Sequence, residues 1–116
     1  MELQAVIDYC SSKKAVTQEF PFDDTTLVFK VSGKMFALMG LEPPHGLNLK
    51  CDPIYAAALR QKYKGIIPGY HMNKKHWNTV NFDSDVPGRL ICELIDHSYK
   101  LVAAKLPKSV KTELGF

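Results

Sequence analysis

The 116-residue sequence has no apolar run long enough to cross a bilayer, and its first residues show no basic segment leading into an apolar one. We therefore expect no membrane partner, no export signal and a cytoplasmic location. Cysteine is scarce, with only Cys10, Cys51 and Cys92, which lie far apart. Three cysteines cannot form two disulfides, and no CxxC or Cys/His spacing indicates a metal site. A reducing compartment fits this usage, and we expect no cofactor.

Acidic residues are missing from residues 53–82, although Asp52 and Asp83 stand directly on either side. Within that stretch the basic residues are Arg60, Lys62, Lys64, Lys74 and Lys75, and the rings that carry a polar atom are Tyr55, Tyr63, Tyr70, His71, His76 and Trp77. Positive charge beside flat rings suits a phosphate backbone. Composition alone favours the other interpretation, a solvated loop whose lysines keep the protein soluble.

The positive charge is concentrated in the second half of the chain. Residues 1–60 contain six Lys/Arg and seven Asp/Glu, a net charge of −1, whereas residues 61–116 contain nine and five, a net charge of +4. This uneven distribution favours a local basic patch over a uniformly basic protein.

Hydrophobic periodicity predicts one α+β domain over residues 1–116, with an antiparallel sheet of about four strands backed by helices in the order α-β-β-β-α-β-α. Residues 17–24 and 65–75 are predicted to be a connection and a long loop. The helices are expected over 2–13, 53–63 and 90–102, with a short one over 107–114, and the strands over 27–31, 34–39, 47–51 and 76–82.

Local signals refine several of these elements. Ser32-Gly33 predicts a two-residue hairpin turn, which would place Phe29 opposite Phe36 and Leu27 opposite Leu38. Asp52-Pro53 is typical of a helix start, because Asp caps the helix and Pro fits its first position. The buried face of that helix is expected to be formed by Ile54, Tyr55, Ala58, Leu59 and Lys62.

Four segments carry a resemblance to a known family: GKMFAL (33–38), LNLKCDP (47–53), PGYHMNKKHWN (68–78) and DHSYKLV (96–102). In this order and spacing the chain resembles the MmcQ/YjbR family of small bacterial proteins over nearly its whole length. The block from Tyr70 to Asn78 is the most specific part. His97 departs from the acidic residue expected beside the Ser-Tyr pair.

The resemblance implies a CyaY-like fold, in which a twisted antiparallel sheet is backed by helices. It also implies DNA binding by a double-wing arrangement of loops and hairpins, although this function is argued from fold alone and names no catalytic residue.

Double-stranded DNA is therefore the expected partner, bound largely through its phosphate backbone, since no helix-turn-helix spacing is present. The expected contacts are Arg60, Lys62, Lys64, Tyr70, His71, Asn73, Lys74, Lys75, His76 and Asn78, with Lys30 and Lys34 as a second wing. Simple solubility of the hairpin is the favoured interpretation of Lys30 and Lys34, and a place in the core is the favoured interpretation of Trp77.

Two other classes of function were weighed. Catalysis is not expected, because none of the histidines or cysteines forms a pair with the spacing that such chemistry needs. Iron delivery is rejected, because the first helix lacks a row of acids. The alternative that stays open is a protein-interaction module without nucleic-acid binding, and we expect a monomer.

Overall fold

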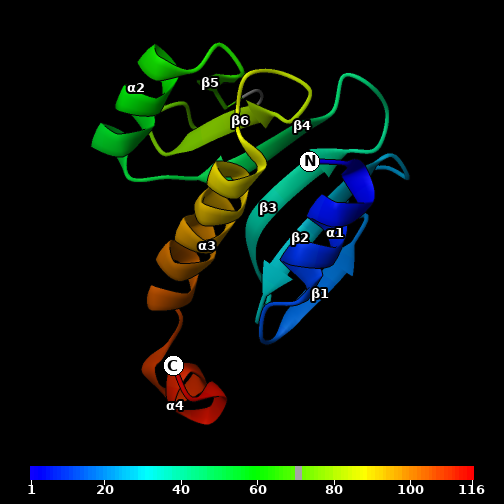
Figure 1. Cartoon of the computed structure of the whole chain (residues 1–116). Coiled ribbons are helices and arrows are strands. Elements are labelled where there is room, and N and C mark those ends of the chain that lie inside the picture. The colour runs from blue at the N-terminus through cyan, green and yellow to red at the C-terminus, as the bar shows by residue number, and fades with distance from the viewer. Residues whose placement is uncertain (70–71) are drawn as a thin grey trace.

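The computed structural model of the protein describes residues 1–69 and 72–116. The elements follow one another as α1 (Leu3–Ser11), β1 (Val16–Glu19), β2 (Thr26–Val31), β3 (Lys34–Gly40), β4 (Gly46–Lys50), α2 (Pro53–Lys62), β5 (Ile66–Pro68), β6 (Trp77–Asn81), α3 (Gly88–Ala104) and α4 (Lys108–Leu114) (Figure 1).

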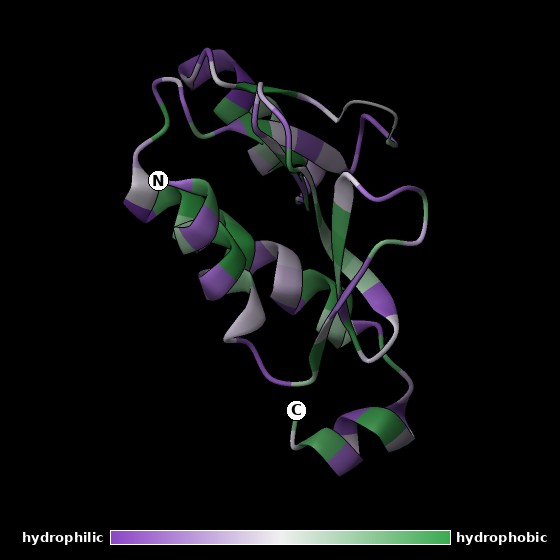
Figure 2. Cartoon of the chain, turned by 90° about the vertical axis from the view of Figure 1, so that its right-hand side faces the viewer, coloured by the Kyte–Doolittle hydropathy of each residue, from purple (hydrophilic) through white to green (hydrophobic). Residues whose placement is uncertain are grey.

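The strands form one antiparallel sheet in the order β1-β2-β3-β4-β6-β5. Helices α1 and α3 cover one face of this sheet, with α3 packed across β3 and β4, whereas α2 lies beside β5 (Figure 1). Figure 2 shows both helices on one side of the strands, so no helix among the described residues covers the other face. Within the described residues, no helix has both the length and the apolar character that crossing a membrane requires.

The core lies between the sheet and the two covering helices. Alternate strand residues point into it, because successive side chains of a strand lie on opposite faces. Its fully buried strand residues include Phe29, Phe36, Met39, Leu47 and Val80, which pack with Val6 of α1 and with Ile91 and Ile95 of α3.

The sheet has six strands instead of about four. The predicted connection includes most of β1, whose sequence VTQE offers only one apolar residue, and this strand joins the sheet at its edge through backbone pairing with β2. The predicted loop contains β5, which has three residues and ends at Pro68. A short polar strand and a strand ending in proline both suit a sheet edge but give no periodic signal.

The predicted hairpin is present, with both turn residues at positive φ (Ser32 46°, Gly33 83°). Its register differs from the prediction, because an irregularity between Phe29 and Lys30 shifts the pairing by one residue. Phe29 therefore pairs with Ala37 and not with Phe36, and Leu27 pairs with Met39 and not with Leu38. A bulge of this kind cannot be read from alternation alone.

The helix start at Asp52 is confirmed, since its carboxylate accepts the N–H groups of Ile54 and Tyr55, both at 3.1 Å. The predicted buried face of α2 is only partly right, because Leu59 is buried as predicted, whereas the other four predicted residues are exposed: Ile54, Tyr55, Ala58 and Lys62. Ala56 and Leu59 are the buried residues of this helix, and Ile54 is 84% exposed. Because α2 lies at the edge of the sheet and not over it, only a narrow stripe of the helix meets the core.

Candidate nucleic-acid interface

The strand pairing brings several distant loops to one end of the sheet. We call it the hairpin end, because the Ser32–Gly33 turn lies there. Lys50, the last residue of β4, pairs with Trp77, the first of β6, so the turn that precedes β6 also lies at this end. The segment between α1 and β1 joins it as well, since the Ser32 N–H donates to the Ala15 carbonyl at 3.1 Å.

Charge is segregated between the two ends of the sheet. The hairpin end carries exposed or half-buried lysines from separate segments, which we call the hairpin-end lysines: Lys14, Lys34, Lys50, Lys74 and Lys75. The loops at the opposite end carry exposed carboxylates: Asp23, Asp24, Glu42, Asp83 and Asp85. Asp52 is an acid at the hairpin end, where its carboxylate caps α2. An anionic partner is therefore attracted to one end of the protein and repelled from the other.

The ion pairs of the described residues leave the hairpin-end lysines without a carboxylate. Those pairs join Lys13 to Asp96, Lys30 to Glu19, His45 to Asp83 and Arg89 to Glu93. Lys74 Nζ instead donates to the Gly69 carbonyl at 3.3 Å, which holds the lysine against the loop without neutralising it. Net positive charge at this end is thus available to an external anion.

Arg60 was predicted to contact DNA, but its guanidinium is used inside the protein. Its Nε donates to Asn78 Oδ1 at 2.6 Å, and one terminal nitrogen donates to the Trp77 carbonyl at 3.3 Å and to the carbonyl of Lys74. Arg60 therefore fastens α2 to the turn and strand that carry Lys74 and Lys75. Its role is to position the loop, so we remove it from the predicted contacts.

The predicted asparagine contacts also support the loop. Asn78 is only 2% exposed and cannot reach a phosphate, and its amide nitrogen donates to the Ala56 carbonyl at 3.4 Å. Asn73 is exposed, yet its side-chain oxygen accepts the N–H groups of Lys75 and His76 at 2.9 and 3.3 Å. The turn before β6 is thus closed by Asn73 and held from beneath by Asn78.

The remaining predicted contacts fall into different places. Lys62 is exposed with its ammonium 5.5 Å from the Tyr63 ring, and His76 is half-buried with its carbonyl accepting the Cys51 N–H at 2.8 Å. Lys64 is exposed, but it precedes β5 at the opposite end of the sheet. The Asp85 carboxylate accepts the Lys64 N–H at 2.9 Å, which keeps a negative charge beside this lysine. Tyr70 and His71 lie outside the described residues.

The two residues of the predicted second wing differ. Lys30 pairs with Glu19 at 3.3 Å, so its charge is compensated within the sheet. Lys34 is exposed next to the hairpin turn and belongs to the hairpin-end lysines.

Sequence reasoning missed Lys50, which lies between the hairpin and the turn before β6. Burial, and then the positive charge of Lys105, lower the pKa of the Lys50 ammonium from its usual value of 10.5. Ser98 anchors this strand end, because its Oγ accepts the Lys50 N–H at 2.9 Å and donates to the Phe36 carbonyl at 2.6 Å. The outward position of Lys50 was visible in the alternation of residues 47–51, but its neighbours were not.

The described residues contain no cluster of three or more His, Cys, Asp or Glu side chains that could hold a metal ion. Burial raises the pKa of the Cys10 thiol to about 12 and, together with the nearby Asp52 charge, that of Cys51 to about 11. Both thiols therefore stay protonated near neutrality, in keeping with their burial in the core.

The geometry defines a class of protein: a six-stranded antiparallel sheet with helices on one face and a basic end built from several loops. The family model described as YjbR matches residues 11–101. The chain belongs to the YjbR family. Among its relatives, "Uncharacterized protein YjbR" of Escherichia coli K12 is 32% identical over 109 residues, covering 93% of this chain and 92% of the relative. "Uncharacterized protein YbdF" of Escherichia coli O157:H7 is 41% identical over 90 residues, which cover 77% of this chain and 74% of the relative.

Solved structures agree with this assignment. The crystal structure of Deinococcus radiodurans protein DR2400, described by the domain DUF419, is 43% identical with a TM-score of 0.92, covering 98% of this chain and 88% of that one. The crystal structure of a Pseudomonas syringae protein has 32% sequence identity and a TM-score of 0.78, and the match covers 88% of this chain and 99% of that one. The α+β fold is thus common to these proteins.

Proposed function

We propose that the protein binds double-stranded DNA at the hairpin end of its sheet, largely through the phosphate backbone. The observation that carries this proposal is the separation of charge along the strands, with the hairpin-end lysines at one end and exposed carboxylates at the other. These lysines come from four separate segments, so the cluster exists only in the folded chain.

The spacing of the lysines suits a charged polymer better than a single small anion. Lys34 begins β3, Lys50 ends β4, and Lys74 and Lys75 precede β6, so they follow adjacent strands of the sheet. Neighbouring strands are about 4.8 Å apart, and the row therefore extends over roughly 10 Å. Phosphates along a duplex can meet several such cations at once, and each contact releases condensed counterions.

Backbone contacts alone predict weak and sequence-tolerant binding. With three or four phosphates contacted, the logarithm of the association constant should fall with the logarithm of the salt concentration with a slope of about −3 to −4. The two wings of this interface are the hairpin at Lys34 and the turn at Lys74 and Lys75, with Lys50 between them.

The test is fluorescence anisotropy with a random-sequence duplex, titrated with salt, for the parent and for a Lys74→Gln/Lys75→Gln variant. We expect the variant to bind more weakly and the slope to become shallower by about 2, because two phosphate contacts are lost. Lys75→Gln and Arg89→Gln form a matched single-charge pair, since Arg89 begins α3 and pairs with Glu93, away from the hairpin end.

Equal effects of Lys75→Gln and Arg89→Gln would mean that only net charge matters and would refute a localised interface. No binding by the parent at low salt would refute DNA binding. In that case the alternative of a protein-interaction module would be tested by a pull-down that survives nuclease treatment.

A further inference from the structure

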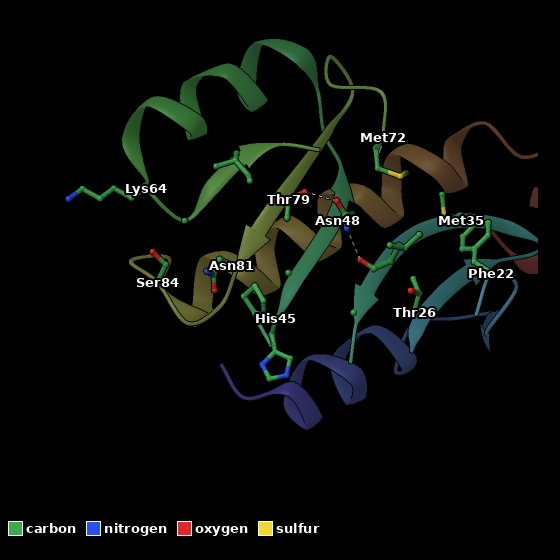
Figure 3. Close-up of a pocket in the computed structure, with 16 residues that line it drawn as sticks. Phe22, Thr26, Met35, His45, Asn48, Lys64, Met72, Thr79, Asn81 and Ser84 are labelled. Atoms are coloured by element: carbon green, nitrogen blue, oxygen red, sulfur yellow. Dashed lines mark hydrogen bonds between the residues drawn. The ribbon is translucent and has the colours of Figure 1, made fainter. Parts of the chain in front are cut away.

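A groove runs over the face of the sheet that the helices leave open, and its volume is about 780 Å³. Its floor is formed by open-face residues of the central strands, above all Leu38, Asn48 and Thr79. Phe22 and Met35 border it on one side and Ile67, on the edge strand β5, on the other, and Figure 3 shows Met72 reaching down from the loop above the strands. The volume lies within the usual range for small-molecule sites.

The borders of the groove expose apolar surface that the fold itself does not use. Phe22 is 68% exposed and Ile67 is 49% exposed, and they lie on opposite borders. Large apolar side chains that meet around a concavity are typical of a binding site, because covering them removes apolar surface from water. Met35 and Met72 add flexible, polarisable thioethers that adapt well to flat ligands.

The floor contains a polar strip within these apolar borders. Thr79 Oγ1 donates to Asn48 Oδ1 at 2.6 Å, and Asn48 Nδ2 donates to the Leu38 carbonyl at 3.3 Å, as the dashed lines in Figure 3 show. This network holds the amide in one orientation. A ligand with apolar faces and a hydrogen-bonding edge would match such a strip between apolar borders.

Charge is kept out of the groove. None of the described residues that line it is a carboxylate, and the side chain of Lys64 points away from it in Figure 3. His45 lines the groove, but its Nδ1 is 3.5 Å from the Asp83 carboxylate and its ring stacks on Phe82, so its contacts are made with residues that do not line the groove. An ionic ligand would lose its hydration there without a charged partner, whereas an uncharged ligand would not.

From these observations we propose that the open-face groove is a binding site for an uncharged, flat, apolar small molecule that carries one hydrogen-bonding edge. This site is separate from the hairpin-end lysines and does not depend on DNA binding.

The probe for this test is N-phenyl-1-naphthylamine, an uncharged fluorophore with an N–H edge, titrated against the native protein. We expect saturable binding at one site. The sulfonated analogue 8-anilino-1-naphthalenesulfonate should bind at least about tenfold more weakly, because the Lys64 side chain points away from the groove and His45 lies beside the Asp83 carboxylate.

Two matched double variants each replace one Phe and one Ile by Ala, the first pair at the borders of the groove and the second pair away from it. Phe22→Ala/Ile67→Ala should weaken binding of the uncharged probe by about tenfold or more, because both borders lose apolar surface. Phe20→Ala/Ile54→Ala removes two exposed residues that do not line the groove and should change the affinity by less than about twofold. Thermal melts of both variants will verify that each is folded.

Three results would overturn the proposal: no saturable binding of the uncharged probe, equal loss in the two double variants, or tighter binding of the sulfonated probe. Measuring the affinity of Phe22→Ala/Ile67→Ala for duplex DNA tests whether this site is separate from the proposed DNA interface. Unchanged DNA affinity supports two independent sites, and a loss of DNA affinity as large as the loss of probe affinity would show that the groove belongs to the DNA surface.

Discussion

Replacing Arg60 by Ala should destabilise the whole fold, although this residue looks from the sequence like a surface cation. Its guanidinium reaches three acceptors in the turn before β6 and in β6 itself: Asn78 Oδ1 at 2.6 Å, the Trp77 carbonyl at 3.3 Å and the carbonyl of Lys74. The planar guanidinium has several N–H donors and can bind all three acceptors at once, whereas no shorter side chain can.

The magnitude follows from what each acceptor loses. Asn78 is 2% exposed, so water cannot replace the donor of its side-chain oxygen, and an unsatisfied buried acceptor costs about 1–3 kcal/mol. The Lys74 carbonyl can bind water because Lys74 is exposed, and the Trp77 carbonyl keeps the Gly69 N–H at 2.8 Å, so the loss of these two hydrogen bonds together adds only about 1 kcal/mol. We therefore expect Arg60→Ala to lower the free energy of unfolding by about 2–4 kcal/mol, and Tm by roughly 10 °C.

The assay is urea unfolding followed by circular dichroism. Lys62→Ala is the control on the same helix: Lys62 is exposed and its ammonium contacts only a tyrosine ring among the interactions described, so about 0.5 kcal/mol or less should be lost. Arg60→Lys keeps the positive charge but lacks the planar guanidinium, so we expect it to lose most of the stability that Arg60→Ala loses. A double-mutant cycle with Asn78→Ala should show a coupling energy of at least about 1 kcal/mol.

The reasoning would be refuted if Arg60→Ala unfolded within about 0.5 kcal/mol of the parent, or if the cycle with Asn78→Ala showed no coupling. Full stability of Arg60→Lys would show that charge, and not the geometry of the guanidinium, holds the loop.

Three further predictions concern other parts of the fold. Ser98 is fully buried, and its hydroxyl bridges β3 and β4. Ser98→Ala should therefore lower the free energy of unfolding in urea by about 2 kcal/mol, whereas Ser109→Ala, at an exposed position, should change it very little. Equal stability of the two variants would contradict this prediction. With thiol pKa values of about 12 and 11, Cys10 and Cys51 should react with a disulfide reagent at pH 8 only after unfolding, and rapid reaction of both in the native protein would show that the core is open. Backbone N–H donors hold the pKa of the Asp85 carboxyl below its usual 3.8, so its stabilising effect is complete above that pH and is lost as the pH falls through the pKa of the folded protein. The difference in free energy of unfolding between the parent and Asp85→Asn should therefore shrink below about pH 4. A difference that grows on acidification would contradict this prediction.

Much of the fold could be predicted where the signal is local. The hairpin at Ser32-Gly33, the Asp52 cap and the apolar stripe of α3 depend on residues only a few positions apart, and all three are present. Edge strands β1 and β5 were missed because they are held by backbone hydrogen bonds to a neighbouring strand, which leave little trace in side-chain pattern.

The candidate site was only partly predictable. Lys74, Lys75 and Lys34 were identified from local charge and lie together at one end of the sheet. Arg60 and Asn78 were assigned to the surface, because sequence cannot show that a cation faces an internal carbonyl or that an amide lies under a turn. Lys64 was grouped with its sequence neighbours, although β5 carries the chain from one end of the sheet to the other.

By itself, the sequence determined that this is an α+β protein of the YjbR family with its cations unevenly distributed. It could do so because composition, periodicity, turn residues and family resemblance are properties of the chain read in order. Only the tertiary structure decided which lysines share a surface and that an open groove lies on the uncovered face of the sheet. Those properties depend on strand order and register, which bring together residues that are far apart in the chain, and no local pattern encodes them.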